Sequence, residues 1–234
     1  MLSIVFAVFL SLMIFVNMPP ALAAQGRYSG AHMPAEAIFQ QSADAVFMLE
    51  TFDVNGESIR TGSGFFVSAD GLAVTNLHVI QNAASATITL YNGEVYPVRG
   101  VHAFSEEFNL AIISIDSDKS GWDYLNYADS DLIETGNSVY VIGSPLGFIN
   151  SMSAGIISSI KREIANENLI QFTSPISFGS GGSPLLNTRG QVIGVTSSSF
   201  SYGQNLNLAV PINNIKALQP GECITLESML KEDE

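Results

Sequence analysis

The sequence predicts an all-β fold, a sandwich or barrel of short strands, and two observations support this prediction. Apolar, β-branched stretches recur at short intervals and are separated by turn residues. Helical periodicity is confined to two brief segments, residues 34–41 and 212–218. The chain has 234 residues, of which 47% are hydrophobic, so it can bury a sizeable core and does not have the composition of a disordered protein.

The expected strands follow one another with turn signals between them. Asp70-Gly71 and Asn92-Gly93 are two-residue hairpin signals, because Asp and Asn tolerate a positive φ and Gly adopts one without cost. Thr188-Arg189-Gly190 is a third turn. A polar, acidic stretch over residues 117–135 is the expected linker between two halves. The strands are expected at residues 44–51, 64–68, 72–75, 86–91, 95–101, 110–115, 138–142, 152–160, 169–173 and 191–197.

The charge balance and the single cysteine exclude several classes of function. The formal net charge is −13, so the surface repels phosphate backbones and no nucleic-acid partner is expected. Cys223 is the only cysteine, which rules out an intramolecular disulfide, and it is expected to be a structural bystander. Neither a His-Glu-x-x-His pair nor a cysteine cluster with zinc spacing occurs, so no metal and no cofactor are expected.

The first residues have the pattern of a secretory signal peptide. Residues 2–18 are apolar with few exceptions, and small residues follow at 21–24, which places a cleavage site after Ala23. We therefore expect residues 1–23 to be removed and the protein to be exported, to the periplasm or the exterior. An uncleaved segment that anchors the chain to the membrane is the alternative, because no Lys or Arg precedes the apolar run.

Three motifs then point to one class of protein. The first comprises Thr61-Gly62-Ser63-Gly64-Phe65 and Thr75-Asn76-Leu77-His78-Val79, and the second is Phe108-Asn109-Leu110-Ala111. The third is Gly179-Ser180-Gly181-Gly182-Ser183-Pro184 followed by Gly190-Gln191-Val192-Ile193-Gly194, and Leu208-Ala209-Val210-Pro211 comes after it. Together they resemble the protease domain of the HtrA/Deg family of trypsin-like serine peptidases.

This resemblance implies two packed six-stranded β-barrels of the chymotrypsin/trypsin type, with the active-site cleft between them. The peptidase domain would span residues 24–218, with an N-terminal barrel at about 44–116 and a C-terminal barrel at about 136–211. Residues 219–234 leave no room for the PDZ domain that many family members carry, and we expect them to form an acidic, solvated and frayed tail.

The resemblance places His78 at the general base and Asn109 where the family has an aspartate. The imidazole takes the proton of the nucleophile, and the carboxylate fixes its tautomer and stabilises its charge. An amide cannot carry that charge, and this exchange lowers turnover by roughly 10⁴ in a related protease. Glu107 is two residues upstream and is an alternative partner for the histidine. His32 and His102 lack such a context and are expected to have no catalytic role.

The nucleophile loop permits two alignments. Without a gap, Gly181 falls on the nucleophile position; by the tripeptide Ser-Gly-Gly, Ser180 is the nucleophile and Ser183 an insertion. The slip of one residue moves a Cα by about 3.8 Å, more than catalytic geometry tolerates unless the loop rearranges. Ser180 is the preferred serine, Ser183 the weaker candidate, and a purely structural role for both is the alternative. The loop residues Gly179, Gly181, Gly182 and Ser183 would form the oxyanion hole.

The specificity pocket would favour an apolar side chain. Residues 171–175, which contribute to its base, contain no carboxylate to bind Lys or Arg. The resemblance places Ser174, Leu206, Asn207 and Leu208 in the pocket. Asn205 and Asn207 stand where the family usually has glycine, and Asn is the side chain that best tolerates a positive φ.

Two functions remain open from the sequence. One is an exported serine endopeptidase that cleaves unfolded or exposed polypeptide after apolar residues through an acyl-enzyme. The other is a catalytically degenerate pseudoprotease that binds peptides in the retained cleft. The partner is a polypeptide substrate or a peptide ligand in either case. A homo-oligomer is a further expectation, and a membrane is a partner only if the N-terminal segment stays uncleaved.

Overall fold

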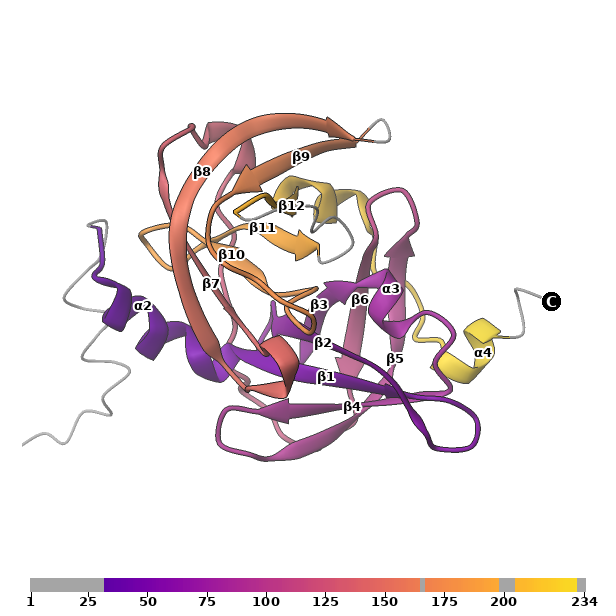
Figure 1. The fold of residues 1–234 in the computed structure, drawn as a ribbon. Coiled ribbons are helices and arrows are strands. Elements are labelled where there is room, and N and C mark those ends of the chain that lie inside the picture. The colour runs from indigo at the N-terminus through magenta and orange to yellow at the C-terminus, as the bar shows by residue number, and fades with distance from the viewer. Residues whose placement is uncertain (1–31, 165–166, 198–204, 231–234) are drawn as a thin grey trace, which may run out of the picture.

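The computed structural model describes residues 32–164, 167–197 and 205–230, and most of them form two closed six-stranded barrels (Figure 1). The predicted all-β, double-barrel fold is therefore confirmed. The predicted signal peptide, residues 1–23, lies outside the described residues. Within the described ranges, no helix is long and apolar enough to cross a bilayer.

The first barrel is antiparallel throughout and closes in the order β1-β2-β3-β6-β5-β4. Its inward-facing side chains include Phe47, Phe66 and Ile113, all fully buried. The strands are β1 (Val46–Phe52), β2 (Ser58–Phe66), β3 (Leu72–Asn76), β4 (Ser85–Leu90), β5 (Val95–Ser105) and β6 (Leu110–Ile115).

The second barrel closes in the order β10-β11-β12-β9-β8-β7. Two of its strands were not among those expected, because β10 has only three residues and begins with a proline, and β12 lies between turn-like Asn and Pro residues. The strands are β7 (Ser138–Gly143), β8 (Ser151–Ile164), β9 (Glu167–Phe172), β10 (Pro184–Leu186), β11 (Val192–Ser197) and β12 (Asn207–Pro211).

A shared apolar cluster joins the two barrels. It combines Phe65 and Leu110 of the first barrel with Ile142 and Leu186 of the second. Helix α2 (Ala35–Ser42) contributes Ile38, which is fully buried in the same cluster. Burial of apolar side chains from both barrels in one core stabilises their relative position, and thereby the cleft between them.

The predicted hairpin turns form, but with a three-residue loop at Asn92-Gly93 and a four-residue loop at Asp70-Gly71 instead of two-residue loops. The N–H of Leu90 donates to the carbonyl of Glu94 at 2.9 Å, and Gly93 has a φ of +86°. The turn at Gly71, where φ is +90°, is closed in the same way by the N–H of Val67 and the carbonyl of Leu72 at 2.8 Å. Only the glycine of each pair has a positive φ, which is typical of a type I turn with a glycine bulge.

The segment between the barrels is packed onto the first one. Trp122 is 4% exposed, and its ring stacks on that of Phe66 with centroids 4.6 Å apart. Tyr96 meets the same indole edge-on at 5.2 Å. The polar linker predicted at residues 117–135 therefore connects the barrels, but an aromatic anchor ties it to the core.

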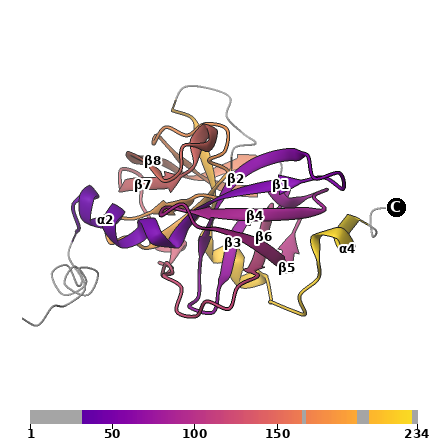
Figure 2. The same cartoon turned by 90° about the horizontal axis from the view of Figure 1, so that it is seen from below.

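The prediction of a solvated, frayed C-terminal tail is wrong for residues 219–230. Ile224 forms an antiparallel bridge with Val101 of β5, and helix α4 (Leu226–Leu230) buries Leu226 in the core of the first barrel. In both views α4 lies at the end of the molecule opposite α2 (Figures 1 and 2). The tail packs because it contains a short apolar run that pairs with β5. The acidic composition of the tail as a whole does not reveal this run.

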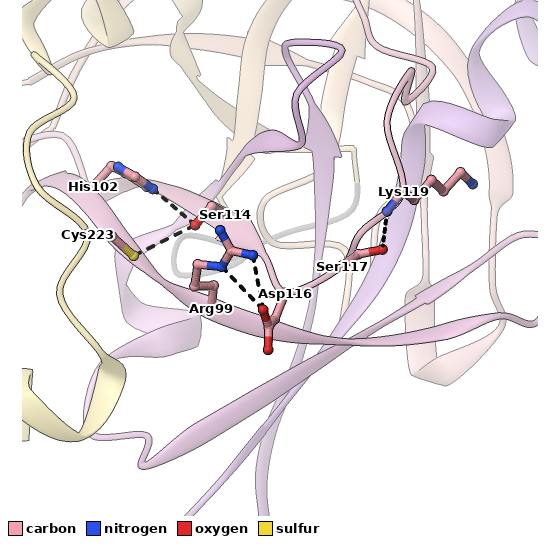
Figure 3. A network of polar contacts seen from close by, with 7 residues as sticks. All are labelled: Arg99, His102, Ser114, Asp116, Ser117, Lys119 and Cys223. Atoms are coloured by element: carbon pink, nitrogen blue, oxygen red, sulfur yellow. Dashed lines mark hydrogen bonds and ion pairs between the residues drawn. The ribbon is translucent and has the colours of Figure 1, made fainter.

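A small polar network lies under this C-terminal segment (Figure 3). His102 Nδ1 is 3.0 Å from the carbonyl oxygen of Gly221, which can only accept a hydrogen bond. Nδ1 of His102 is therefore protonated, and Nε2 accepts from the Ser114 hydroxyl at 3.0 Å. Cys223 Sγ lies 3.7 Å from the same hydroxyl and is a free thiol.

Candidate active site

Two neighbouring strands of the first barrel bring His78 and Asn109 together. His78 belongs to the short helix α3 (Leu77–Ile80), directly after β3, and Asn109 precedes β6. Asn76 and Leu110 are register partners on β3 and β6, so the residues next to them meet at the same barrel end. Asn109 has a φ of +48°, a conformation that asparagine adopts more readily than most residues.

The side-chain amide of Asn109 bridges the backbone and the ring of His78. Its Oδ1 accepts from the backbone N–H of His78 at 2.9 Å, and its Nδ2 lies 2.8 Å from Nδ1 of the ring. Oδ1 is 3.2 Å from Nδ1 and so is the more distant of the two amide atoms, although it has a second lone pair beside the one that the backbone N–H occupies. The opposite orientation would set an NH₂ against that backbone N–H, so the backbone fixes which end of the amide faces the ring.

This orientation determines the tautomer of His78. The closer contact to Nδ1 is made by Nδ2, which can only donate, so we assign Nδ1 as the acceptor and place the proton of the neutral ring on Nε2. A base in a serine peptidase needs a free Nε2 to take the proton of the hydroxyl. A carboxylate at position 109 would accept from both the backbone and Nδ1, and would leave Nε2 free.

The surroundings of His78 also disfavour its charged form. Burial lowers the pKa of the imidazole below its usual value, and the positive charge of Arg60 lowers that pKa further. The side-chain hydrogen bond with Asn109 raises the pKa, but it offsets these effects only in part, and the amide carries no charge. The imidazolium ion that forms during serine catalysis is therefore destabilised in this site.

Ser180 lies in a tight turn that satisfies its own polar groups. The N–H of Ser180 donates to the carbonyl of Ser177 at 2.9 Å, and the N–H of Ser177 donates to Ser180 Oγ at 3.2 Å. The residue is 2% exposed. Among the described residues, no hydrogen bond joins Ser180 or Ser183 to His78. The structure thus brings together His78 and Asn109, but not His78 and a serine hydroxyl.

Gly181 is the loop residue that rests on β2. Its carbonyl accepts from the N–H of Ser63 at 2.8 Å, and the Ser63 hydroxyl donates to the carbonyl of Gly179 at 2.7 Å. Gly179 and Gly182, on either side, have φ values of +88° and +86°. A side chain on Gly182 would overlap the carbonyl oxygen of Ser63. Two glycines therefore allow the loop to lie this close to the first barrel.

Ser183 faces the interior, away from the cleft. It is fully buried, and its hydroxyl has no hydrogen-bond partner among the described residues. A Cβ at Gly143 of β7 would overlap this hydroxyl, so the serine fills the space that the glycine leaves. The N–H groups of Gly179 and Gly181 donate to no acceptor in the described part of the chain.

The residues predicted for the specificity pocket lie together but bond to one another. Asn207 Nδ2 donates to the carbonyl of Ser174 at 2.7 Å, and Asn207 is 5% exposed. Leu208 is also buried, whereas Leu206 is 45% exposed. Asn205 has the positive φ expected of a glycine substitute, at +60°, but Asn207 is extended in β12. The Asn207 side chain thus extends toward Ser174 and changes the lining of the pocket.

A cavity of about 730 Å³ lies beside His78, which forms part of its lining. Its walls come from β1, β2, α3, the turn after β7 and the residues just before the nucleophile loop. Sequence reasoning missed the lining residues that belong to no motif, namely Met48, Glu50, Ile59, Arg60, Leu146 and Gly147. The lining residues are Met48, Glu50, Ile59, Arg60, Thr61, His78, Val79, Leu146, Gly147, Phe178 and Gly179.

Comparisons with known proteins agree with this architecture. Residues 62–195, more than half of the chain, match the family model described as the trypsin-like peptidase domain. The serine protease HhoA of Synechocystis sp. is 32% identical over 167 residues, which cover 68% of this chain and 42% of that relative. A periplasmic serine endoprotease of the DegP-like type from Chlamydia pneumoniae is 38% identical over 149 residues, 62% of this chain and 30% of the relative.

A DegP-like periplasmic serine endoprotease from Rhizobium meliloti is 32% identical over 155 residues, 64% of this chain and 30% of the relative. The matched part thus spans less than half the length of each of these relatives. The part that these relatives share with this chain is the protease domain.

Proposed function

Because this chain belongs to the family of trypsin-like peptidase domains, we propose that it binds an extended polypeptide segment in the cleft at His78 and does not hydrolyse it. The observation that carries this proposal is the amide of Asn109, whose Nδ2 lies 2.8 Å from Nδ1 of His78. The amide keeps the proton of the ring on Nε2, so the ring has no free nitrogen toward a nucleophile.

The nucleophile loop supports the same proposal. Ser180 Oγ accepts a hydrogen bond within its own turn, and Gly181, which occupies the nucleophile position in the alignment without a gap, has no side chain. An acyl-enzyme requires a hydroxyl within hydrogen-bond reach of the base. The groups that bind a peptide backbone are retained, since the N–H groups of Gly179 and Gly181 have no acceptor among the described residues.

We further propose that the protein acts outside the cytoplasm. The DegP-like relatives are named periplasmic, and the apolar first residues of this chain have the pattern of an export signal. Cleavage after Ala23 would release the domain, and an uncleaved segment would anchor it to the membrane. Self-association remains a prediction.

Fluorophosphonate labelling of the purified protein tests the proposal, because these reagents react with a serine that its base has already activated. We expect no adduct at Ser180 or Ser183 by peptide mapping, under conditions in which trypsin is fully labelled. Mapping is required because Ser114 also bonds a histidine, His102, at 3.0 Å. An adduct on Ser180 that disappears in His78→Ala would contradict the proposal and support the endopeptidase instead.

A further inference from the structure

We infer that the cavity beside His78 binds an internal polypeptide segment carrying a large apolar side chain and, one or two residues away, an acidic side chain that pairs with Arg60. This inference rests on the proposed function and names the ligand of the same cleft. Three features of the cavity support it: its exposed apolar walls, the backbone conformation of Leu146, and an arginine without a carboxylate partner.

Large apolar side chains in the walls of the cavity are exposed to solvent. Phe178 is 84% exposed and Leu146 is 68% exposed, and both line the cavity together with Met48 and Ile59. Exposed apolar area forgoes the stabilisation that burial would give, and clustered area of this kind marks a binding surface. A large apolar side chain of a ligand would bury both residues at once.

The backbone of Leu146 adopts a conformation that leucine rarely takes. Its φ is +53°, in the left-handed region, and this places its side chain in the cavity wall. The conformation is held by hydrogen bonds, since the N–H of Leu146 donates to the carbonyl of Phe178 at 2.7 Å and Gly147 bonds Ser144 at 3.2 Å. Strain of this type persists only where the surrounding contacts hold it, and it concentrates at active sites and ligand-binding sites.

Arg60 supplies the only positive side chain of the cavity lining. Two ion pairs occur among the described residues, Arg99–Asp116 and Lys119–Glu94, so Arg60 takes part in neither. Its Nη1 donates to the carbonyl of Gln81, which leaves its other N–H groups available. A carboxylate is the acceptor that matches this planar group best.

The second charged residue in the lining, Glu50, already has a donor of its own. The Ser58 hydroxyl donates to Glu50 Oε1 at 2.7 Å. Glu50 therefore competes only weakly for Arg60, but its charge opposes an acidic ligand. A variant that removes the charge of Glu50 is therefore a control with the opposite expected effect, because it should strengthen the binding of an acidic peptide.

The predicted specificity pocket is less suited to an apolar side chain than the cavity, so the cavity is the main binding site for such a side chain of the ligand. The hydrogen bond between Asn207 and Ser174 joins the walls of the predicted specificity pocket. An apolar side chain that would normally enter that pocket meets a polar amide instead. A ligand can bury an apolar side chain more completely against Leu146 and Phe178.

Fluorescence anisotropy with peptides blocked at both ends tests the inference. Each peptide carries one central Phe in a Gly/Ser background, with Glu, Gln or Lys one or two residues away. At 0.15 M salt, where the screening length is about 8 Å, the net charge of −13 contributes little and local pairing decides. We expect the best Glu peptide to bind about tenfold more tightly than its Gln counterpart, the magnitude typical of a charge-assisted hydrogen bond.

Five variants assign that difference to the cavity. Arg60→Gln should abolish the preference for Glu, whereas Arg99→Gln, which removes the same charge elsewhere on the barrel, should retain it. Glu50→Gln should increase the affinity of the Glu peptide. Phe178→Ala should weaken all peptides about tenfold without affecting folding, because Phe178 is almost fully exposed, and Leu132→Ala, at an exposed leucine outside the cavity, should change nothing.

The outcomes separate this inference from the proposed function. Binding that does not discriminate Glu from Gln, or a preference that survives in Arg60→Gln, overturns the inference and leaves the proposed function intact. Absence of binding by every peptide overturns both, and cleavage of the peptides overturns the proposed function alone.

Discussion

The double variant Gly181→Ser/Asn109→Asp is expected to gain fluorophosphonate reactivity at position 181. The serine would provide a hydroxyl where Gly181 rests against Ser63, and the aspartate would return the proton of His78 to Nδ1. The backbone of Gly181 does not have a positive φ, so its backbone conformation is one that a serine can adopt. The rate of labelling should exceed that of Gly181→Ser alone by roughly 10⁴.

The single variants and His78 provide the controls for this experiment. Asn109→Asp alone should not label, because no hydroxyl is in reach, and the double variant should lose its reactivity when His78→Ala is added. Equal labelling of Gly181→Ser with and without Asn109→Asp would contradict the role assigned to the amide. Labelling of Asn109→Asp at Ser180 would show that the nucleophile is the displaced serine instead.

The variant Gly182→Ala is expected to lose at least about 4 kcal/mol of unfolding free energy, in the range of the most damaging single substitutions. Its added Cβ would overlap the carbonyl oxygen of Ser63 and lie 2.7 Å from Thr75 Oγ1, at a φ of +86°. The left-handed backbone alone costs only about 1–2 kcal/mol. The remainder reflects the contact that holds the loop against the first barrel, and urea unfolding measures the total.

Gly136→Ala isolates the backbone contribution. Gly136 has a φ of +93°, but a Cβ there would meet no atom within 4 Å. We expect this variant to lose only the backbone cost of about 1–2 kcal/mol. Equal losses in the two variants would mean that the nucleophile loop does not depend on close approach to Ser63.

The sequence predicted the residues of the site better than their interactions. The motif around His78 placed it correctly after a strand. The second motif placed Asn109 just before the neighbouring strand, at the same end of the barrel. Which atom of the Asn109 amide faces the ring could not be predicted, because the backbone N–H of His78 in α3 decides it. That N–H becomes a partner only once the barrel is closed.

The features that the sequence failed to predict depend on contacts between distant segments. Ile224 looks like part of an acidic tail until its bridge to Val101 is known. The sequence around Leu146 contains no pattern that predicts a positive φ, because this conformation depends on a hydrogen bond to the carbonyl of Phe178. Most of the strands and the motifs, in contrast, follow from local apolar alternation and from glycine positions, so they were predictable, whereas β10 and β12 were not.

The tautomer of His78 is the most direct test of the central claim, and a long-range ¹H–¹⁵N correlation spectrum of the uniformly labelled protein measures it. The spectrum should be recorded well above the pKa of His78, which lies below its usual value because the ring is buried and Arg60 is near. We predict a proton on Nε2 and a free Nδ1 for His78. His102, whose Nδ1 faces a carbonyl, should show the opposite tautomer in the same spectrum. A proton on Nδ1 of His78 would contradict the account, since its Nε2 would then be free to act as a base.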